Sequence, residues 1–583
     1  MSQEKKRKPI GELLREKNLI NEGHIQISLQ EQQVTSERLG EALQRLGFVS
    51  EFDVGTTIAQ QEGRTFIDVD QVVPEEATLR LFNENLCLSN HFLPMNHTSK
   101  EVEIVTSSDE VDQLETLITR NTGLRPIFNQ GESDKIHNMV RHYYFFLENP
   151  VDQLLQQEIR ILSTDVAGTR SVDKFIEYLF QLAIKERASD IHVRPLERSI
   201  NIAFRVDGVV RSMFSVHPSF RRIISTLKMK AEMNIAEKRL PQDGSFTEMI
   251  MNNRVDFRVS TTVCIHGENM VLRVLPNQTS VLGISQLGLF EEDLQAVRSI
   301  FQEPFGLVLV TGPTGSGKTT TLFSVLRSLD LTDSNVITVE DPIEFRLPLV
   351  RQTQVNAKAG YDFANAVRYF LRHDPDIIMV GEVRDKLTAE VAMSASETGH
   401  LVLSTLHTNT ALGALPRLRS LDVPPFMLAD SLVAILCQRL VRRNCSVCRE
   451  SYPPTPEDLA YLKDHTIDKL YRGKGCKVCG QSGFFGRTVI YELFIPDQAL
   501  TNCIYRDEPL DVIESMARKK GFFNLFECAV KKVKCGETTL SEVRRVLGAS
   551  YAGTSVSGQS AARESQSTSL QASSHSPTTQ ERS

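Results

Sequence analysis

The N-terminal part of the chain carries one pattern of apolar and polar positions twice. Residues 9–32 align with residues 38–61, so that Leu14 corresponds to Leu43. Each copy is predicted to form a short helix, a turn and a second helix that begins after a polar N-cap. The predicted turn and N-cap residues are Asn18 and Asn21 in the first copy and Gly47 and Ser50 in the second.

A mixed pattern follows the two helical repeats. Residues 63–147 combine helical stretches with short strands such as 102–106, which predicts an α/β extension of the N-terminal domain. Residues 148–165 are polar and predict a linker or a connecting helix. The repeats and the extension together are expected to form one domain over residues 1–147.

Two further α/β domains are predicted after the linker. A helix over 172–186 precedes alternating strands at 200–206 and 254–260, whereas the later part alternates strands with helices, as parallel sheets with crossover helices do. Ser, Thr and Gln dominate the C-terminal stretch, which predicts disorder. The predicted segments after the linker are a small domain (166–280), a larger domain (281–550) and a disordered tail (551–583).

A glycine-rich loop lies between a strand and a helix of the larger domain. Its pattern is G-x-x-x-x-G-K-T, and an apolar strand at 307–310 precedes it. The backbone N–H groups of such a loop point at a phosphate, and the helix N-terminus adds positive potential. Lys318 is expected to meet the β- and γ-phosphates of ATP, and Thr319 to hold Mg²⁺. The predicted nucleotide-binding residues of this loop are Gly312, Pro313, Thr314, Gly315, Ser316, Gly317, Lys318, Thr319 and Thr320.

Acidic residues follow two more apolar strands of the same domain. Glu340, Asp341 and Glu344 follow one strand, and Glu382 follows another. Because the carboxyl ends of parallel strands meet at one edge of a sheet, these residues are expected beside the phosphates. There they would hold the Mg²⁺ shell or orient the attacking water.

Two histidines flank a third strand, at 401–406. His400 precedes this strand and His407 follows it. A single histidine is more often structural than functional. Since this pair belongs to a domain that must sense a γ-phosphate, a sensing or relay role is predicted beside the structural alternative.

Four of the ten cysteines form two CxxC pairs. Cys445, Cys448, Cys476 and Cys479 supply the ligand set of a closed tetrahedral zinc site, within a module at 440–485. Four protein ligands leave no open coordination position. The zinc is therefore predicted to be structural.

Composition excludes several classes of protein. The chain has 66 Lys and Arg against 73 Asp and Glu, a net charge of −7, which does not suit a general nucleic-acid coat. It has no apolar stretch of about 18 residues, and its basic start lacks the apolar region of a secretion signal. We therefore expect a cytoplasmic protein with no direct nucleic-acid partner.

Taken together, the motifs resemble those of the bacterial secretion ATPases of type II secretion and type IV pilus assembly, the GspE and PilB group. The resemblance rests on GPTGSGKTTT, VEDPIEF, LRHDPDIIMVGEVRD and TGHLVLSTLHTN, and it extends over residues of about 165–550. It implies an α/β fold class, with a RecA-like P-loop ATPase domain preceded by a smaller α/β, PAS-like domain and an N-terminal helical-repeat domain. It also implies a homohexamer that is peripheral at the inner membrane, where it docks on a platform protein.

The same resemblance implies roles for individual residues. Glu344 resembles the glutamate that positions water, and Glu382 resembles the Walker B acid. Guanidinium groups from a second domain would share the charge of the γ-phosphate, so that ATP holds two domains together and hydrolysis releases them. The arginines implied to face the phosphates are Arg258, Arg273, Arg368 and Arg372.

The N-terminal repeats resemble the paired motifs of the MshE N-terminal domain, which binds cyclic di-GMP. The second copy matches the R-L-G-x-x-L opening, whereas Pro9 replaces the expected arginine of the first copy. Arginine stacking on guanine and charge-assisted hydrogen bonds to phosphate supply much of the chemistry of such a site. The alternative is a helical module that docks on an inner-membrane platform protein. The candidate residues for cyclic di-GMP are Gly11, Leu14, Arg38, Leu39, Gly40 and Leu43.

The resulting prediction is an ATPase that uses ATP, Mg²⁺ and Zn²⁺ and powers assembly of a type IV pilus or a type II pseudopilus. Regulation by cyclic di-GMP is an additional expectation. Two alternatives remain, a retraction or conjugation-type ring motor and a cyclic-dinucleotide sensor whose nucleotide turnover is vestigial.

Overall fold

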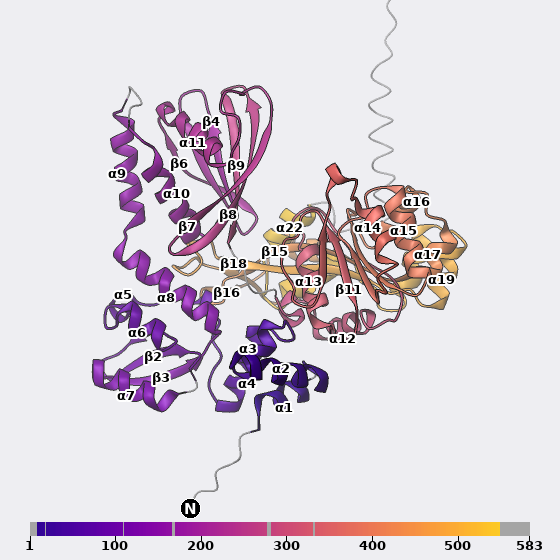
Figure 1. Ribbon diagram of the computed structural model, residues 1–583, viewed down its shortest axis with the longest axis horizontal. Coiled ribbons are helices and arrows are strands. Elements are labelled where there is room, and N and C mark those ends of the chain that lie inside the picture. Colours follow the sequence, from indigo (N-terminus) through magenta and orange to yellow (C-terminus); the bar gives the residue numbers. More distant parts are fainter. Residues whose placement is uncertain are drawn as a thin grey trace, which may run out of the picture.

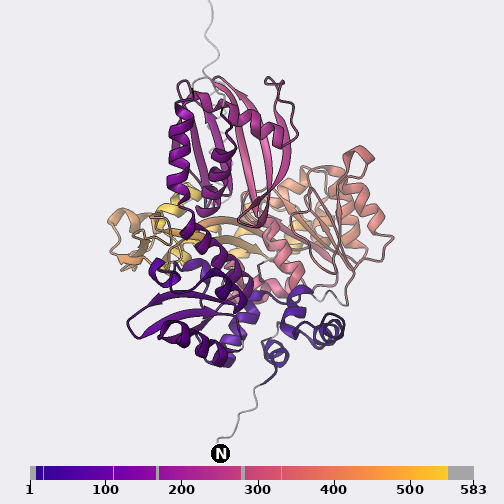
Figure 2. The same cartoon turned by 60° about the vertical axis from the view of Figure 1, so that its left-hand side comes forward.

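A computed structural model describes residues 8–548, apart from residues 18, 109, 166–169, 277–281, 330 and 332. The predicted turn residue Asn18 and the predicted tail at 551–583 therefore lie outside the described residues. The larger α/β domain, predicted to be an ATPase and called the ATPase domain below, lies to the right in Figure 1. To the left, the small sheet domain lies above the N-terminal α/β unit. The helical repeats lie beneath the ATPase domain (Figures 1 and 2).

The two N-terminal repeats fold as two helical hairpins, as predicted. Their helices are α1 (Ile10–Glu16), α2 (Glu22–Thr35), α3 (Leu39–Arg45) and α4 (Glu51–Glu62). The side chain of Asn21 accepts the His24 N–H at 2.8 Å, and Ser50 Oγ accepts the Asp53 N–H at 3.0 Å, which confirms both N-caps. Gly47 forms the second turn with φ +85°, a value that favours glycine.

The N-terminal α/β unit is built on a three-stranded sheet of order β1-β2-β3. Its elements are η1 (Val69–Gln71), α5 (Glu76–Leu79), α6 (Glu84–Ser89), β1 (Phe92–His97), β2 (Glu101–Thr106), α7 (Val111–Thr122), β3 (Arg125–Gln130) and α8 (Ser133–Glu148). β2 pairs antiparallel with β1 and parallel with β3. It covers the predicted strand at 102–106, and its apolar residues enter a core of this unit's own.

The segment predicted as a linker is a helix of the next domain. It forms α9 (Val151–Ser163), in which Val151, Leu155 and Leu162 are buried. These side chains belong to the same core as α10 (Asp173–Lys185) and the small sheet. The polar residues of this segment suggested a linker, but the apolar side chains at helical spacing decide its packing.

The small domain contains a six-stranded antiparallel sheet of order β6-β5-β4-β9-β8-β7. Its further elements are β4 (Asp190–Pro195), β5 (Ile200–Val206), β6 (Val209–Val216), η2 (Pro218–Arg221), α11 (Arg222–Lys230), β7 (Gln242–Ile250), β8 (Asn253–Cys264) and β9 (Gly267–Pro276). Side chains of α9, α10 and α11 join those of the sheet in one core. The opposite face carries alternate polar residues, among them Asp190 and His192 of β4.

The ATPase domain is a seven-stranded sheet of order β12-β11-β13-β14-β10-β15-β18. Its elements are η3 (Ile284–Leu287), α12 (Glu291–Ile300), β10 (Gly306–Thr311), α13 (Lys318–Ser328), β11 (Val336–Glu340), β12 (Arg351–Gln354), η4 (Ala357–Ala359), α14 (Phe363–Phe370), β13 (Ile377–Val380), α15 (Lys386–Glu397), β14 (Leu401–Leu406), α16 (Ala414–Arg419), α17 (Pro425–Ser431), β15 (Leu432–Asn444) and β18 (Phe484–Phe494). All strands run parallel except β18, which pairs antiparallel with β15. Leu307 and Leu309 enter one core and Val308 and Val310 the other, so both faces of β10 are covered.

A small finger and a helical end complete the chain. The finger consists of β16 (Arg449–Tyr452), α18 (Pro456–Leu462) and β17 (Leu470–Gly473), inserted between β15 and β18, and the end consists of α19 (Gln498–Tyr505), α20 (Leu510–Arg518), α21 (Leu525–Lys534) and α22 (Leu540–Leu547). Within the described ranges, none of the helices combines the length and apolar character that crossing a bilayer requires.

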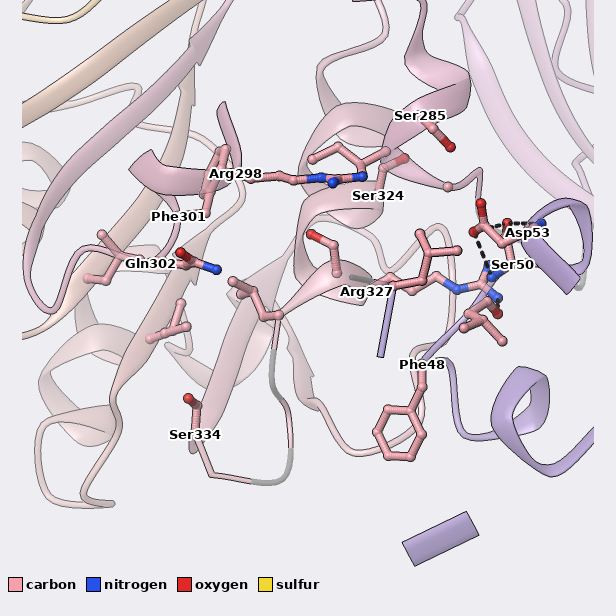
Figure 3. A pocket seen from close by; sticks show the side chains of 18 of the residues that line it. Phe48, Ser50, Asp53, Ser285, Arg298, Phe301, Gln302, Ser324, Arg327 and Ser334 are labelled. Carbon is pink, nitrogen blue, oxygen red and sulfur yellow. Dashed lines mark hydrogen bonds between the residues drawn. The ribbon is translucent and has the colours of Figure 1, made fainter. Parts of the chain in front are cut away.

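The second repeat docks on the ATPase domain. Arg327, in the last turn of α13, donates from Nε to the Gly47 carbonyl at 3.2 Å and from Nη2 to the Val49 carbonyl. A cavity of about 480 Å³ lies beside these hydrogen bonds, lined from the repeat by Phe48 and Asp53 and from the ATPase domain by α12 and α13 (Figure 3). Arg327 therefore fixes the turn of the second repeat on the ATPase domain, beside this cavity.

A candidate nucleotide site at the carboxyl edge of the parallel sheet

The glycine-rich loop has the backbone conformation that its sequence predicts. Gly312 has φ +143°, and a Cβ there would lie 2.4 Å from the Gln438 carbonyl oxygen. Gly315 and Gly317 also have positive φ, and α13 begins directly afterwards, at Lys318. The loop curls at a helix N-terminus, the arrangement that binds phosphate groups.

Lys318 closes the loop on itself. Its Nζ donates to the Gly312 carbonyl at 2.9 Å and to the Pro313 carbonyl at 3.2 Å. Burial lowers the pKa of Lys318, and the negative charge of Glu382 opposes this effect. The ammonium group therefore lies between the loop and an acid that follows β13, two strands away from β10, and phosphate oxygens would replace the carbonyls as its acceptors.

Glu382 and His407 face one another across neighbouring strands. Glu382 follows β13 and His407 follows β14, and His407 Nε2 lies 3.1 Å from Glu382 Oε1. The other carboxylate oxygen of Glu382 accepts Arg384 Nε at 2.7 Å. The loop, the acid and the histidine thus meet at one edge of the sheet, as the strand ends predict.

The acids after β11 differ in environment. Glu340 is buried and accepts hydrogen bonds from Thr338 Oγ1 at 2.7 Å and Gln352 Nε2 at 3.0 Å. Burial raises the pKa of Glu340, with a smaller contribution from the charge of Glu344. Glu344 and Asp341 are exposed. They are free of the buried contacts that hold Glu340, which suits side chains that meet solvent or substrate.

Gln438 of β15 is a residue of the site that the sequence did not single out. Its Nε2 donates to the Ser316 carbonyl at 2.9 Å, and its Oε1 accepts Thr321 Oγ1 at 2.9 Å. These bonds join the loop to the first turn of α13. In the sequence, Gln438 is marked only as a polar residue within an apolar strand. That this strand lies beside β10 is known only from the strand order of the sheet.

The position of His400 favours the structural alternative. His400 precedes β14 at the amino end, and its carbonyl accepts the N–H of Gly306, where β10 begins. The loop lies at the other end of these six-residue strands, roughly 20 Å away at about 3.3 Å per residue. His400 Nδ1 lies 2.9 Å from the Ala395 carbonyl, so it serves the α15–β14 turn.

The four arginines lie away from the loop in this conformation. Arg273 pairs with Asp190 of its own sheet at 3.3 Å, and Arg258 lies opposite Arg273 in the β8–β9 register. Arg368 donates to Asn365 of its own helix at 3.3 Å. Arg372 precedes His373, whose carbonyl accepts Asn335 Nδ2 at the amino edge of the sheet. Among the described residues, none of the four arginines forms a hydrogen bond or an ion pair with the loop.

The four cysteines form a cluster of the right size for zinc. The sulfur atoms all lie within 4.8 Å of one another, with Cys445 and Cys476 separated by 3.7 Å and Cys448 and Cys479 by 3.9 Å. A tetrahedron with zinc–sulfur bonds of about 2.3 Å has edges of about 3.8 Å, so the four thiolates fit the metal. Backbone N–H groups of Gly475 and Gly483 point at Cys448 and Cys479 and would stabilise the thiolates.

Several candidate residues for cyclic di-GMP are structural. Leu14 and Leu43 are 0% exposed and belong to the core of the repeats, which corrects their assignment to a ligand surface. Gly11 is also buried, and a Cβ there would come within 3.2 Å of Leu39. Arg38, the N-cap residue of α3, is the exposed member of the set. Leu39 and Gly40 are half-buried.

Two family profiles match the chain. The profile described as Type II/IV secretion system protein matches residues 165–545, and the MshEN domain profile matches residues 62–162. The second match begins at the last residue of α4 and ends within α9, whereas we expected the MshE-type region to span residues 1–147.

Individual relatives agree with these profiles. The type II secretion system protein E of Xanthomonas campestris is 36% identical over 526 residues, covering 86% of this chain and 92% of that protein. The type II secretion system ATPase E of Vibrio cholerae is 42% identical over 398 residues, covering 68% of this chain and 78% of that protein. The type IV pilus assembly ATPase PilB of Thermus thermophilus is 35% identical over 527 residues, covering 87% of this chain and 58% of that protein.

Proposed function

The chain belongs to the type II/IV secretion system protein family and is an ATPase of that family, and on this premise we propose that it works as a homohexamer that powers assembly of a type II pseudopilus or a type IV pilus. The observation that carries the proposal is the meeting of Lys318, Glu382 and His407 at the carboxyl edge of one sheet. A membrane partner, an inner-membrane platform protein, would convert the motion into extraction of pilin-like subunits at the cytoplasmic face.

The geometry supports a mechanism based on positioning and charge. Lys318 would bind the β- and γ-phosphates, and Thr319 and Glu382 would hold Mg²⁺, which would neutralise developing charge when bound. The exposed carboxylate of Glu344 would orient the attacking water. His407, whose Nε2 lies 3.1 Å from Glu382, would report the state of the γ-phosphate to the loop that follows β14.

Domain closure would supply the missing positive charge. Arg273 is ion-paired with Asp190 and lies on the polar face of the small sheet, next to Arg258. Exchange of Asp190 for a phosphate would bring both arginines to the nucleotide and draw the small domain onto the ATPase domain. Hydrolysis would reverse the exchange and reopen the domains. Arg368 and Arg372 lie on the exposed face of α14 and its end, so we assign their phosphate contacts to a neighbouring subunit of the ring.

The cysteine cluster would hold zinc as a structural ion. Four sulfur ligands leave no coordination position for a substrate. The finger is also a separate insertion between β15 and β18 and supplies none of the residues of the nucleotide site described above.

ATP turnover by the full-length protein tests the proposal. We expect steady phosphate release from the wild type and a loss of about 100-fold or more in Lys318→Ala and Glu382→Gln. Glu390→Gln is the matched control, because Glu390 is an exposed acid of α15 that pairs only loosely with Lys386 at 3.7 Å. Equal turnover by the wild type and Glu382→Gln would contradict the motor and favour the alternative of a sensor with vestigial turnover.

The MshEN match favours a second role, binding of cyclic di-GMP by the N-terminal region. The candidate ligand residue is the exposed Arg38 at the start of α3, which precedes the matched residues 62–162 and is proposed from the repeat pattern alone. The buried leucines would only support the backbone around it. Calorimetry with cyclic di-GMP on the full chain should show heat that Arg38→Ala removes and Arg45→Ala retains. No heat from the wild-type chain would leave the repeats as a docking module.

A further inference from the structure

The loop that follows His407 is tied down by a buried carboxylate of another strand. Glu492 lies on β18 and is 2% exposed. Its Oε2 accepts the N–H of Ala411 at 2.6 Å, and its Oε1 accepts the N–H of Leu525 at 3.1 Å. A buried carboxylate that uses both oxygens on backbone N–H groups fixes the two segments that it joins.

The tie acts close to the nucleotide site. Only three residues separate His407 from Ala411, namely Thr408, Asn409 and Thr410. Arg439 of β15 adds a second tether, since its Nη2 donates to Asn409 Oδ1 at 3.2 Å. The loop is therefore held from β15 and β18 at one end, while its other end begins at the histidine that faces Glu382.

The position of β18 makes this tie independent of the catalytic strands. β18 is the outer, antiparallel strand of the sheet, and Glu492 lies opposite Cys437 in the β15–β18 register. Glu492 thus lies one strand beyond β15 and holds the loop from outside the P-loop and the acids. Of its two hydrogen bonds, the one from Ala411 leads to the nucleotide site through the loop, whereas the one from Leu525 leads to the start of α21.

We infer that Glu492 is a positioning residue for ATP hydrolysis, because it fixes the 408–411 loop and thereby holds His407 against Glu382. The inference rests on the proposed role of His407 at the γ-phosphate. Loss of the tie would let the loop move, and displacements of about 1 Å at a catalytic site reduce rates by up to about 100-fold. The glutamine variant keeps the size of the side chain but offers only one acceptor oxygen in place of two.

A double-mutant cycle in the full-length protein tests the inference. We expect Glu492→Gln to lower kcat on the order of tenfold, with KM for ATP changed by less than about twofold, since the loop does not hold the phosphate-binding residues. In the His407→Ala background, Glu492→Gln should lower kcat by less than about twofold, because the residue through which it acts is already absent. Asn409→Ala, an exposed change at the second tether, should show the same dependence on His407 with a smaller loss.

Two controls separate positioning from general destabilisation. Glu542→Gln neutralises another carboxylate that is 0% exposed and that bonds Arg442 and Arg545 but not the loop. It should lower the melting temperature and leave kcat within about twofold when assays are run below the melting transitions of all variants. Hydrogen exchange should rise at residues 407–411 in Glu492→Gln and not in Glu542→Gln.

The outcomes are distinct. Equal losses from Glu492→Gln in both backgrounds, or a loss confined to KM, would overturn the inference and leave the motor proposal intact. Wild-type kcat in His407→Ala would overturn the role of His407 and the inference with it. The response of Glu382→Gln would still decide the ATPase proposal separately.

Discussion

Single polar side chains determine the shape of the nucleotide site. Gln438 joins Ser316 of the loop to Thr321 of α13 through one amide. These two hydrogen bonds fix the position of the loop relative to the helix. Such a side chain belongs to the scaffold that positions Lys318, although it touches no phosphate.

Replacing Gln438 should weaken nucleotide binding. Gln438→Ala leaves the Ser316 carbonyl and the Thr321 hydroxyl without their partner, so we expect KM for ATP to rise about tenfold, from losses of roughly 1 kcal/mol or more per group. Gln438→Glu should raise KM further, since its carboxylate cannot donate to Ser316 and repels phosphate. Equal affinity of Gln438→Glu and the wild type in nucleotide titrations would contradict this role.

A second residue-scale prediction concerns pH. Burial would raise the pKa of Glu542, but hydrogen bonds from Arg545 and Arg442 outweigh burial and lower it to about 2. A lowered folded-state pKa gives stability that is present above about 4.5, the ordinary value, and is lost as pH falls from there toward 2. The contribution at neutral pH is on the order of 3 kcal/mol.

Melting curves of Glu542→Gln measure this contribution. The variant should melt several degrees below the wild type at pH 7, and the difference should shrink as pH is lowered below about 4.5. A difference that does not change between pH 7 and pH 3 would show that the carboxylate charge is not the source of the stability.

The residues that sequence predicted best are those with a fixed local motif. Lys318 and Glu382 follow strands that their own apolar neighbours define, and the structure brings them together. His400 precedes β14, so the rule that ligands bind at the carboxyl ends of parallel strands, which located the acids, already favoured its structural alternative. Gln438 and Glu492 were missed because their roles depend on partners more than 80 residues distant in the chain, as their hydrogen bonds show.

At the scale of elements, the spacing of apolar residues predicted whether a helix or strand forms better than it predicted which domain core that element joins. The helical hairpins, β5 and β14 form where the pattern places them, since caps and apolar spacing act locally. α9 was expected to connect two domains, yet its three buried side chains join the core of the small domain. The core that a helix joins depends on which face of a neighbouring sheet is uncovered. The composition of the helix does not contain this information.

The finger between β15 and β18 should depend on its metal. β16 and β17 form a two-stranded sheet of four residues each, too short to be stable alone. We expect the protein to contain about one zinc per chain, and Cys476→Ser or a strong chelator to raise hydrogen exchange at 449–452 and 470–473. Cys535→Ser, at an exposed cysteine outside the cluster, is the control. Unchanged exchange after zinc removal would show that the finger folds without metal.

At the scale of the whole molecule, a polar contact and a cavity lie where the second repeat meets the ATPase domain. Arg327 bonds two backbone carbonyls of the 47–49 turn, and residues of both units line the cavity beside it (Figure 3). Interfaces of this kind allow relative motion of domains. We therefore expect that loss of these hydrogen bonds lets the repeat move relative to the ATPase domain.

Arg327→Ala should release the repeat without unfolding it. Each lost hydrogen bond to a charged group is worth about 1.5–3 kcal/mol, so exchange at residues 47–53 should rise, while the repeat core around Leu14 stays protected. Arg298→Ala is the matched control, because Arg298 lines the same cavity and makes no hydrogen bond to the repeat within the described residues. Equal exchange patterns in the two variants would show that Arg327 does not hold the repeat.

The order of strands in the sheet has a consequence for synthesis of the protein. The groups of the nucleotide site come from five neighbouring strands, and the last of them, β15, reaches Gln438 long after the loop has left the ribosome. β18, with the tie to the 408–411 loop, follows only after the whole finger. A nascent chain therefore carries its phosphate loop for more than 100 residues of elongation before β18 can pair with β15.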